Sequence, residues 1–271
     1  MKNTITVLGI SGSIRSNYKN IDKLQSFVEE ADTPDELNAK IYNSKLMFAN
    51  SDLTVAHALL GAKQNGATIR LISITKLFEH KNQNLYENLI TYETVDDIGD
   101  IDTLSINEYE LQTLLQNIEQ CNGILLSTPV YFGDRSSVAN KLLQLTNKKK
   151  LLKNKAFGVL SIGAKRNGGQ ETTNIYTLYE AMMQEAIVIG NGPKTSQYGG
   201  TVHAGDLNKA IEDSFGMETS YGTGRQVAQL SKLLQPQVIQ KNEKLNITIL
   251  ITMDSNKKYE TIVEKYFEVY N

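Results

Sequence analysis

Short apolar runs alternate along this chain with longer amphipathic stretches. The runs are rich in β-branched residues and apolar on both faces, as buried parallel strands are, and they cover 5–10, 67–73, 123–127, 156–162 and 186–190. The stretches between them predict helices over 20–30, 33–42, 50–65, 108–120 and 174–185. This alternation predicts an α/β fold with a five-stranded parallel sheet and right-handed crossovers.

Residues 18–49 interrupt this alternation after the first strand. They are polar and helical in pattern, and Thr33-Pro34-Asp35-Glu36 has the Pro and Glu spacing of a helix N-terminus. We interpret 18–49 as a helical insertion within the loop that follows the first strand. The chain would then return at Asn50 and Ser51, where Asn50 either completes a site at that loop or only caps the next helix.

The end of the chain carries a further strand and helix. The pattern predicts a sixth strand over 244–252 and a final helix over 257–270. We therefore divide the chain into a main domain, 1–233, and a C-terminal strand-helix extension, 234–271. Residues 76–106 have no clear period, and their acidic run at 96–102 is typical of a solvated loop, without the ligand spacing of a metal site.

Charge and cysteine content exclude several classes of protein. The 28 Lys and Arg residues against 30 Asp and Glu give a net charge of −2, which argues against nucleic acid as a partner. The single cysteine, Cys121, excludes a disulfide framework or a cysteine-ligated cluster within one chain. The chain shows neither an N-terminal leader nor an apolar run of about 20 residues, so we expect a cytoplasmic protein without membrane contact.

The loop after the first strand, Ser11-Gly12-Ser13-Ile14-Arg15-Ser16-Asn17, offers hydroxyls, open backbone and one cation. It matches neither GxGxxG, nor a Walker A loop, nor the GxSxG nucleophile elbow. Its composition suits a phosphate monoester held by hydroxyls and backbone N–H groups. A plain Ser/Gly turn is the alternative at this point.

Two more loops should join it at the same edge of the sheet. They are Thr128–Asp134, with a proline, two aromatic residues and a glycine, and 163–172, with two cations and two adjacent glycines. The carboxyl ends of parallel strands are where open α/β sheets bind ligands. The aromatic loop suits a planar ring, and the paired glycines permit close backbone approach.

The chain resembles the NAD(P)H-dependent FMN reductases and iron–sulfur flavoproteins of the flavodoxin-like superfamily. The resemblance rests on four segments in order: GISGSIRS, GILLSTPVYFG, GAKRNGGQETT and DSFGMETSYGTGRQVAQL. It implies a flavodoxin-like three-layer sandwich that binds FMN. The cysteine motif of the iron–sulfur branch has no counterpart here, so we expect no cluster and no other metal.

By this resemblance, the first loop would bind the FMN phosphate and the other two would line the isoalloxazine ring. The implied cofactor-binding residues are Ser11, Ser13, Arg15, Ser16, Asn17, Pro129, Val130, Tyr131, Phe132, Gly133, Lys165, Arg166, Asn167, Gly168, Gly169 and Gln170. The insertion splits the phosphate loop and so bears on Ser16 and Asn17. No catalytic residue is nominated, because neither half-reaction of a flavin requires a protein acid or base.

The function expected from the resemblance is an oxidoreductase. Hydride would pass from NADPH or NADH to FMN, and on to a quinone, azo, nitro or other small acceptor. An FMN electron-transfer protein that serves a protein partner is the main alternative, and a scaffold that has lost FMN is a third. The resemblance also implies a homodimer or homotetramer. His203, after the fifth strand, and the Gly222–Arg225 segment, which reads as a helix start, are further positions of interest.

Overall fold

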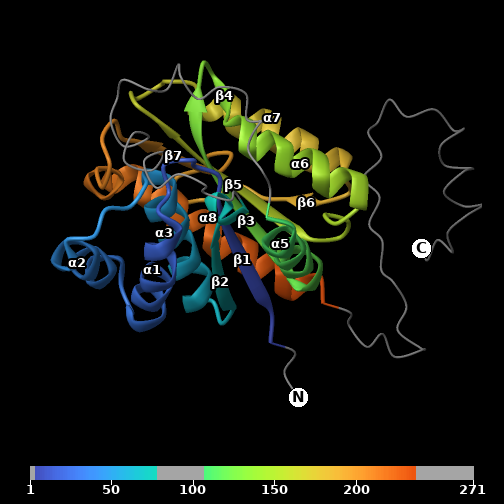
Figure 1. Cartoon of the computed structure of the whole chain (residues 1–271), viewed down its shortest axis with the longest axis horizontal. Coiled ribbons are helices and arrows are strands. Elements are labelled where there is room, and N and C mark those ends of the chain that lie inside the picture. Colours follow the sequence, from blue (N-terminus) through green and yellow to red (C-terminus); the bar gives the residue numbers. More distant parts are fainter. Residues whose placement is uncertain (1–3, 78–106, 236–271) are drawn as a thin grey trace, which may run out of the picture. The chain divides into compact units, whose positions relative to one another are not determined.

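The computed structural model describes residues 4–77 and 107–235, and these residues belong to one compact unit (Figure 1). The predicted strand over 244–252, the predicted helix over 257–270 and the acidic run at 96–102 lie outside the described residues. The division into a main domain and a C-terminal extension therefore stays a prediction.

A parallel sheet forms the middle layer, in the order β2-β1-β3-β5-β6. Its central strands are β1 (Thr6–Ser11), β3 (Gly123–Tyr131) and β5 (Ala156–Gly163), and β2 (Thr68–Ser73) pairs with β1 on the outer side. Helices lie between the successive parallel strands β1, β2, β3, β5 and β6, as parallel pairing requires. This is the flavodoxin-like strand order, so the fold class expected from the sequence is confirmed.

The fifth position of the sheet differs in detail from the expectation. In place of one strand over 186–190, two short strands share it: β6 (Ile187–Val188) pairs with the start of β5, and β7 (Gly200–His203) with its end. Between them the backbone of Gly190 lies against Gln197, where a Cβ would be only 2.4 Å from the Gln197 carbonyl oxygen. The loop thus leaves the sheet and rejoins it, which the apolar run alone did not indicate.

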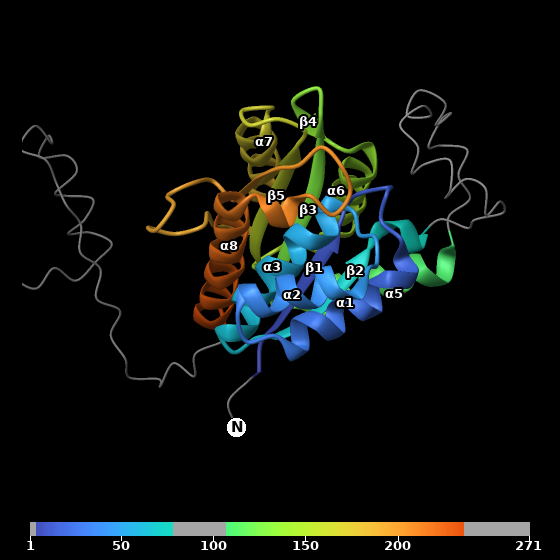
Figure 2. The same ribbon diagram turned by 90° about the vertical axis from the view of Figure 1, so that its left-hand side faces the viewer.

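Helices cover both faces of the sheet (Figures 1 and 2). One layer holds α1 (Tyr18–Glu30), α2 (Pro34–Ser44), α3 (Asn50–Gln64) and α8 (Ser214–Leu233). The other holds α5 (Glu108–Gln120), α6 (Ser137–Lys149) and α7 (Gln170–Met183). Each layer packs its own buried cluster against one face, with Leu125 in the first cluster and Leu126 in the second. A short 3₁₀ turn, Ile74–Leu77, follows β2, and another, Ala210–Glu212, precedes α8.

The predicted insertion forms the helices α1 and α2. Thr33 caps α2 as predicted, since its Oγ1 accepts a hydrogen bond from Glu36 N at 3.2 Å and Glu36 Oε2 accepts one from Asp32 N. The end of α1 is fixed to α3 by Lys63, whose ammonium donates to the carbonyls of residues 28, 29 and 31. These bonds satisfy carbonyl groups that a helix leaves unpaired at its C-terminus.

His57 joins α2 to α3 from a fully buried position. Its Nδ1 lies 2.9 Å from the Leu53 carbonyl and its Nε2 lies 2.9 Å from the Asn38 side chain. Burial lowers the pKa of His57 to about 4, so the ring is neutral in the folded protein. His57 is therefore a structural residue.

Two helix boundaries in this layer and the next differ from the sequence expectation. Helix α7 begins at Gln170 instead of residue 174, because Gly169, at φ +100°, turns the chain directly into it. The Gly222–Arg225 segment lies in the middle of α8 and does not start it. The prediction of a helix start at this segment was wrong. Its glycines lie inside the helix, where a residue without a side chain allows close packing.

Glycines allow α3 and α8 to cross at backbone contact. A Cβ on Gly224 would lie 1.7 Å from the Ala58 carbonyl oxygen, and a Cβ on Gly61 would lie 2.2 Å from the Tyr221 carbonyl oxygen. Such separations are far inside van der Waals contact, so neither position accepts a larger residue without moving a helix. This crossing sets the distance between α3 and α8.

Replacing Gly224 by Ala should therefore destabilise the protein. Because the new methyl group meets backbone that cannot rotate away, we expect the free energy of unfolding to fall by about 2 kcal/mol or more. Urea denaturation measures this. The matched control is Gly205→Ala, where a Cβ would meet no atom within 4 Å. Equal stability of the two variants would contradict the account of the crossing.

Candidate functional site

The serine loop leaves β1 at the carboxyl edge of the sheet and is fixed by its own backbone. Gly12 N donates to the Ser127 carbonyl at 2.7 Å, Ser16 N donates to the Ser13 carbonyl, and Ser13 Oγ accepts from Arg15 N at 3.2 Å. A Cβ on Gly12 would lie 2.9 Å from the Ser127 carbonyl oxygen, which explains the glycine. The loop is thus a preformed turn.

The predicted residues of this loop take different roles. Ser11, Ser13 and Ser16 are buried, whereas Arg15 is half-buried. Asn17 is the N-cap of α1, and its side chain accepts a hydrogen bond from Lys19 N at 3.1 Å. The side chain of Asn17 thus has a structural use that the insertion created.

Helix α3 returns to the serine loop, as the insertion model predicts. Its buried Asp52 faces the hydroxyls of Ser11 and Ser16, which lower the pKa of this carboxyl against the larger effect of burial. The Asn50 side chain is directed elsewhere: it donates to the Asp206 carbonyl and accepts from the backbone N–H groups of Lys209 and Ala210. Both interpretations of Asn50 are therefore wrong: it does not complete the serine loop, and the N-cap of α3 is Ala49.

The aromatic loop is a hairpin arm that extends β3 beyond the sheet. β3 pairs with β4 (Asp134–Arg135) in antiparallel fashion, Tyr131 opposite Asp134, and the two-residue turn between them has φ +52° at Phe132 and φ +82° at Gly133. Two positive φ values are typical of a type I′ turn, which rarely places a bulky residue first. Phe132 is fully exposed there.

Tyr131, next to the turn of the arm, lies near the serine loop. Burial raises the pKa of its hydroxyl, and the positive charge of Arg15 opposes this rise. Arg15 must therefore be within electrostatic reach of Tyr131. The first and second loops consequently meet at the same edge of the sheet.

Arg135 supports the arm from below. Its guanidinium pairs with Glu180 of α7 and donates to Asn140 of α6 at 3.1 Å, and the arginine side chain is 9% exposed. An ion pair this buried holds its partners in one geometry. The arm is thereby fixed to both helices of its layer.

The third loop is organised by Gln170, which is 1% exposed. The Gln170 amide donates to the carbonyls of Lys165 and Val202 at 2.8 and 3.1 Å, and its oxygen accepts from Gly168 N at 2.7 Å. All of these bonds lie within the protein. The predicted ligand Gln170 is therefore the residue that shapes the loop.

Arg166 also has a partner within the protein. Its guanidinium pairs with Asp213 at 2.5 Å, and the same carboxylate caps α8 and accepts from His203 N. Arg166 thus ties the third loop to the start of α8. Among the other predicted residues of this loop, Lys165 and Asn167 are exposed.

Two glycines bring the second and third loops into contact. A Cβ on Gly169 would lie 2.8 Å from Gly133 Cα, and Thr173 Oγ1 donates to the Gly133 carbonyl at 3.2 Å. The predicted residues thus form a continuous rim from Ser13 through Tyr131 and Gly133 to Gly169. Pro129 and Val130 lie on the strand between these loops.

Other reactive residues lie away from this rim or have structural roles. Burial raises the pKa of the Cys121 thiol to about 11, so it is a core residue and not a thiolate. His203 ends β7 with an exposed side chain. Among residues 4–77 and 107–235, no group of three or more His, Cys, Asp or Glu side chains is arranged to hold a metal ion. In the same residues, no helix combines the length and the hydropathy of a membrane span.

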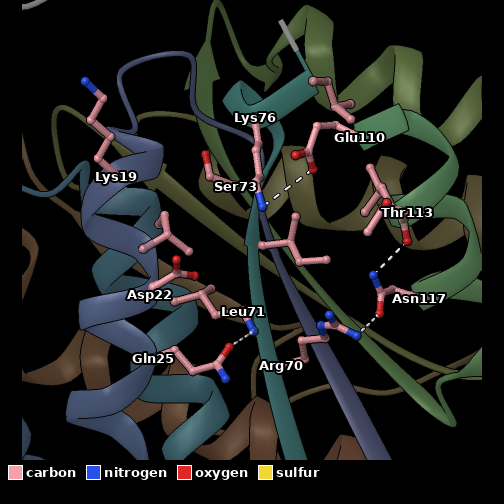
Figure 3. A pocket seen from close by; sticks show the side chains of 14 residues that line it. Lys19, Asp22, Gln25, Arg70, Leu71, Ser73, Lys76, Glu110, Thr113 and Asn117 are labelled. Carbon is pink, nitrogen blue, oxygen red and sulfur yellow. Dashed lines mark hydrogen bonds and ion pairs between the residues drawn. The ribbon is translucent and has the colours of Figure 1, made fainter. Parts of the chain in front are cut away.

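A separate cavity of about 500 Å³ lies along the outer edge of β2, between α1 and α5 (Figure 3). Most of its polar groups are already paired: Arg70 with Asn117, Lys76 with Glu110 at 3.5 Å, and Leu71 N with Gln25 Oε1 at 2.9 Å. The last bond covers a backbone donor of an edge strand, a usual way to block strand pairing. We assign no ligand to this cavity.

Sequence reasoning missed three charged residues that position the rim: the carboxylates Asp52 and Asp213 and the cation Arg135. Asp52 occupies the third position of a helix, a normal capping position, and this pattern is common on exposed helices. Only its complete burial distinguishes Asp52 from an ordinary aspartate in the first turn of an exposed helix. Asp213 could have been suspected from its place before Ser214–Gly216, where it caps α8.

Comparison with known proteins places the chain in a family. The family model for NADPH-dependent FMN reductase matches residues 41–193, more than half of the chain. The chain belongs to this family. The match begins after the serine loop, within the inserted segment.

The chain is also similar to curated iron–sulfur flavoproteins. It is 33% identical over 131 residues to one from Methanocaldococcus jannaschii, an alignment that covers 46% of this chain and 67% of the relative. It is 31% identical over 131 residues to one from Methanosarcina thermophila, covering 46% and 64%. The chain thus aligns with about two thirds of the length of these relatives.

Solved structures show the same fold. The structure of RosB with bound 8-demethyl-8-formylriboflavin-5'-phosphate superposes with a TM-score of 0.53 at 11% identity, covering 93% of each chain. At this identity the likeness concerns the arrangement of strands and helices alone.

The role of Gln170 in the third loop can be tested by substitution. Gln170→Leu would leave the N–H of Gly168 and the carbonyls of Lys165 and Val202 without their partner. Burying such groups unpaired costs about 1–3 kcal/mol, so we expect a loss of this size in the free energy of unfolding.

Urea denaturation again gives the measurement, with Gln116→Leu on the exposed side of α5 as the control. A Gln170→Leu protein as stable as the control would show that the loop does not depend on this side chain.

Proposed function

We propose that the protein is an FMN-dependent oxidoreductase that takes hydride from NADPH or NADH and reduces a small acceptor. The proposal rests on one observation, that the family to which the chain belongs and the arrangement of its three loops both indicate FMN binding. A member of the NADPH-dependent FMN reductase family here presents a serine loop, an aromatic turn and a glycine loop on one rim of the sheet. The carboxyl edge of a parallel sheet is where such folds bind their nucleotides.

The residues of the rim fit the parts of FMN. The serine loop offers Ser13 and Arg15 to a phosphate group, and Ser11 Oγ and Ser127 Oγ are buried beneath it without a hydrogen bond of normal geometry in the described structure. Buried hydroxyls without partners are rare and often mark a missing ligand or water. Gly133, where a Cβ would meet no atom within 4 Å, leaves backbone open beside Tyr131 and Phe132, which suits a flat ring.

The chain's own residues bind and orient, whereas bound FMN supplies the chemistry by accepting hydride at its ring and passing electrons on. Tyr131 and the exposed Phe132 would pack on the ring system. Lys165, exposed on the third loop, would meet the negatively charged nicotinamide nucleotide or the reduced ring. Arg166 is held by Asp213 and contributes to the shape of the loop instead.

The main alternative is an FMN electron-transfer protein that serves a protein partner and lacks a nicotinamide site. The fully exposed Phe132 at the tip of the arm favours it, because an isolated aromatic ring on a rigid turn suits a docking contact. Both proposals require FMN, and they differ in whether a pyridine nucleotide reduces it.

Anaerobic absorbance of the purified protein, loaded with FMN, separates these functions. We expect flavin bands that bleach when NADPH or NADH is added, because the reductase proposal has hydride pass directly to the bound ring. Bands that persist with both nucleotides but bleach with dithionite would favour the electron-transfer protein. Failure to retain FMN under any condition would overturn both.

A matched pair of variants tests where the phosphate binds. Arg15→Ala should weaken FMN binding by about ten-fold or more, as expected for loss of a charged hydrogen bond. It should leave riboflavin, which has no phosphate, unaffected. Lys19→Ala, four residues further on and beyond the serine loop, is the control and should change neither affinity.

We further propose that the protein is a homodimer formed through α7. Four large side chains of this helix are exposed, Tyr176, Tyr179, Met182 and Met183, and Met183 is 86% exposed. They recur at a spacing of three to four residues and so share a side of the helix. A second copy of the chain is the occupant that this face suits, since an apolar stripe along a helix can pair with itself about a two-fold axis.

Sedimentation equilibrium tests the dimer. The double variant Tyr179→Lys, Met183→Glu should be monomeric where the parent protein is dimeric, because it places charges in an apolar contact. The control is Tyr42→Lys on α2, which is 80% exposed and should stay dimeric. A monomeric parent protein would contradict the proposal.

A further inference from the structure

Asp52 is a fully buried carboxyl group directly below the serine loop. It is 0% exposed and lies in the first turn of α3. Its Oδ2 accepts one hydrogen bond, from Ala49 N at 3.0 Å. Its Oδ1 makes no hydrogen bond of normal geometry in the described structure. A buried carboxylate normally requires several donors, and the further donors that act on Asp52 are the hydroxyls of Ser11 and Ser16.

The side chains that act on this carboxyl are the hydroxyls of Ser11 and Ser16, and none of them is a cation. Ser73, Ser11 and Ser127 are aligned across β2, β1 and β3, and all three are buried. Ser11 Oγ and Ser127 Oγ also lack a normal hydrogen bond in the described structure. The hydrogen of the Ser11 hydroxyl can therefore point either toward Asp52 or away from it.

An ionised Asp52 and a bound phosphate would compete for these hydroxyls. A carboxylate accepts hydrogen bonds and cannot donate, so it would draw the Ser11 hydrogen toward itself. A phosphate also requires donors, and two anions near each other in a buried setting repel strongly. A protonated Asp52 removes both conflicts.

We propose that Asp52 is a positioning residue that takes up a proton when the serine loop binds a phosphate monoester. The proton comes from solvent and converts the carboxylate to a carboxylic acid. The acid donates its O–H to Ser11 Oγ, and Ser11 then directs its own hydrogen away from Asp52, toward the phosphate side of the loop. This inference rests on the proposed function, since FMN is the phosphate monoester concerned.

The surroundings of Asp52 support a proton of this kind. Burial raises the pKa of Asp52 to about 6, while the hydroxyls of Ser11 and Ser16 and the Ala49 N–H oppose that rise. No charged side chain is among the groups that shift it in the described structure. Within the neighbouring elements, Arg15 lies in the loop near Tyr131, His57 on α3 is neutral, and Asp206 and Lys209 lie on the loop that Asn50 holds.

The expected pH dependence has a defined sign. Above the pKa of Asp52 in the free protein, binding must add a proton, so the dissociation constant for FMN should rise by up to about ten-fold per pH unit. The second ionisation of a phosphate monoester, near pH 6, has the opposite effect where the dianion binds better. The two effects can be separated because only the first depends on Asp52.

The test compares FMN binding by the parent protein and by Asp52→Asn between pH 6 and 8.5, measured by quenching of flavin fluorescence. From pH 6.5 to 8.5 we expect the dissociation constant to rise by about ten-fold or more in the parent protein relative to the variant. Riboflavin, measured in parallel, should show no difference in slope between the two proteins.

A second measurement needs no variant and keeps the test valid if Asp52→Asn does not fold. Calorimetric titration of the parent protein with FMN at pH 8, in two buffers of different ionisation enthalpy, counts the protons taken up. About one proton per FMN is expected, and none for riboflavin.

The outcomes distinguish this inference from the function on which it rests. Equal pH slopes in the parent protein and the variant, or FMN binding without proton uptake, would overturn the role of Asp52 and leave FMN binding intact. Absence of FMN binding at every pH would overturn the proposed function and this inference together.

Discussion

Parallel pairing of β1 with β2 on one side and β3 on the other is the constraint on which the rest of this structure depends. It sets Ser11 level with Ser73 and Ser127 and directs every loop of the rim to one edge. Because parallel strands must be linked by crossovers, each strand end also begins a helical connection. The serine loop, the aromatic arm and the glycine loop are three such connections. Their proximity follows from topology and requires no direct bond among all three.

The insertion shows how much a fold of this kind tolerates within its central loop. Helices α1 and α2 lengthen the first crossover, yet α3 still packs on β1, where Gly9 leaves room for Val55 and Leu59. The entropic cost of closing a loop rises only slowly with its length. Lys63 and His57 also fix the added helices to α3. The site is therefore preserved, although its loop and its helix N-terminus are far apart in sequence.

Buried polar groups at the rim divide into two kinds. Gln170 and Asp213 are satisfied by protein partners and give the loops their shape. Ser11, Ser127 and one oxygen of Asp52 are buried without such partners in the described structure. Groups of the first kind stabilise the protein, whereas groups of the second kind reduce its stability unless something else satisfies them. This contrast locates the site more sharply than the shape of the surface does.

The sequence by itself determined the α/β class, most of its strands and helices, the insertion and the three loops, because these depend on local hydrophobic pattern and turn chemistry. It also determined the family through short motifs. Only the tertiary structure decided which motif residues remain available to bind a cofactor. Gln170, Arg166 and Asn17 resemble ligands in the sequence, but each is held by partners distant in sequence or created by the insertion. The helix crossing at Gly224 and the burial of Asp52 were likewise decided by packing, since one residue's environment depends on segments that local pattern does not relate to it.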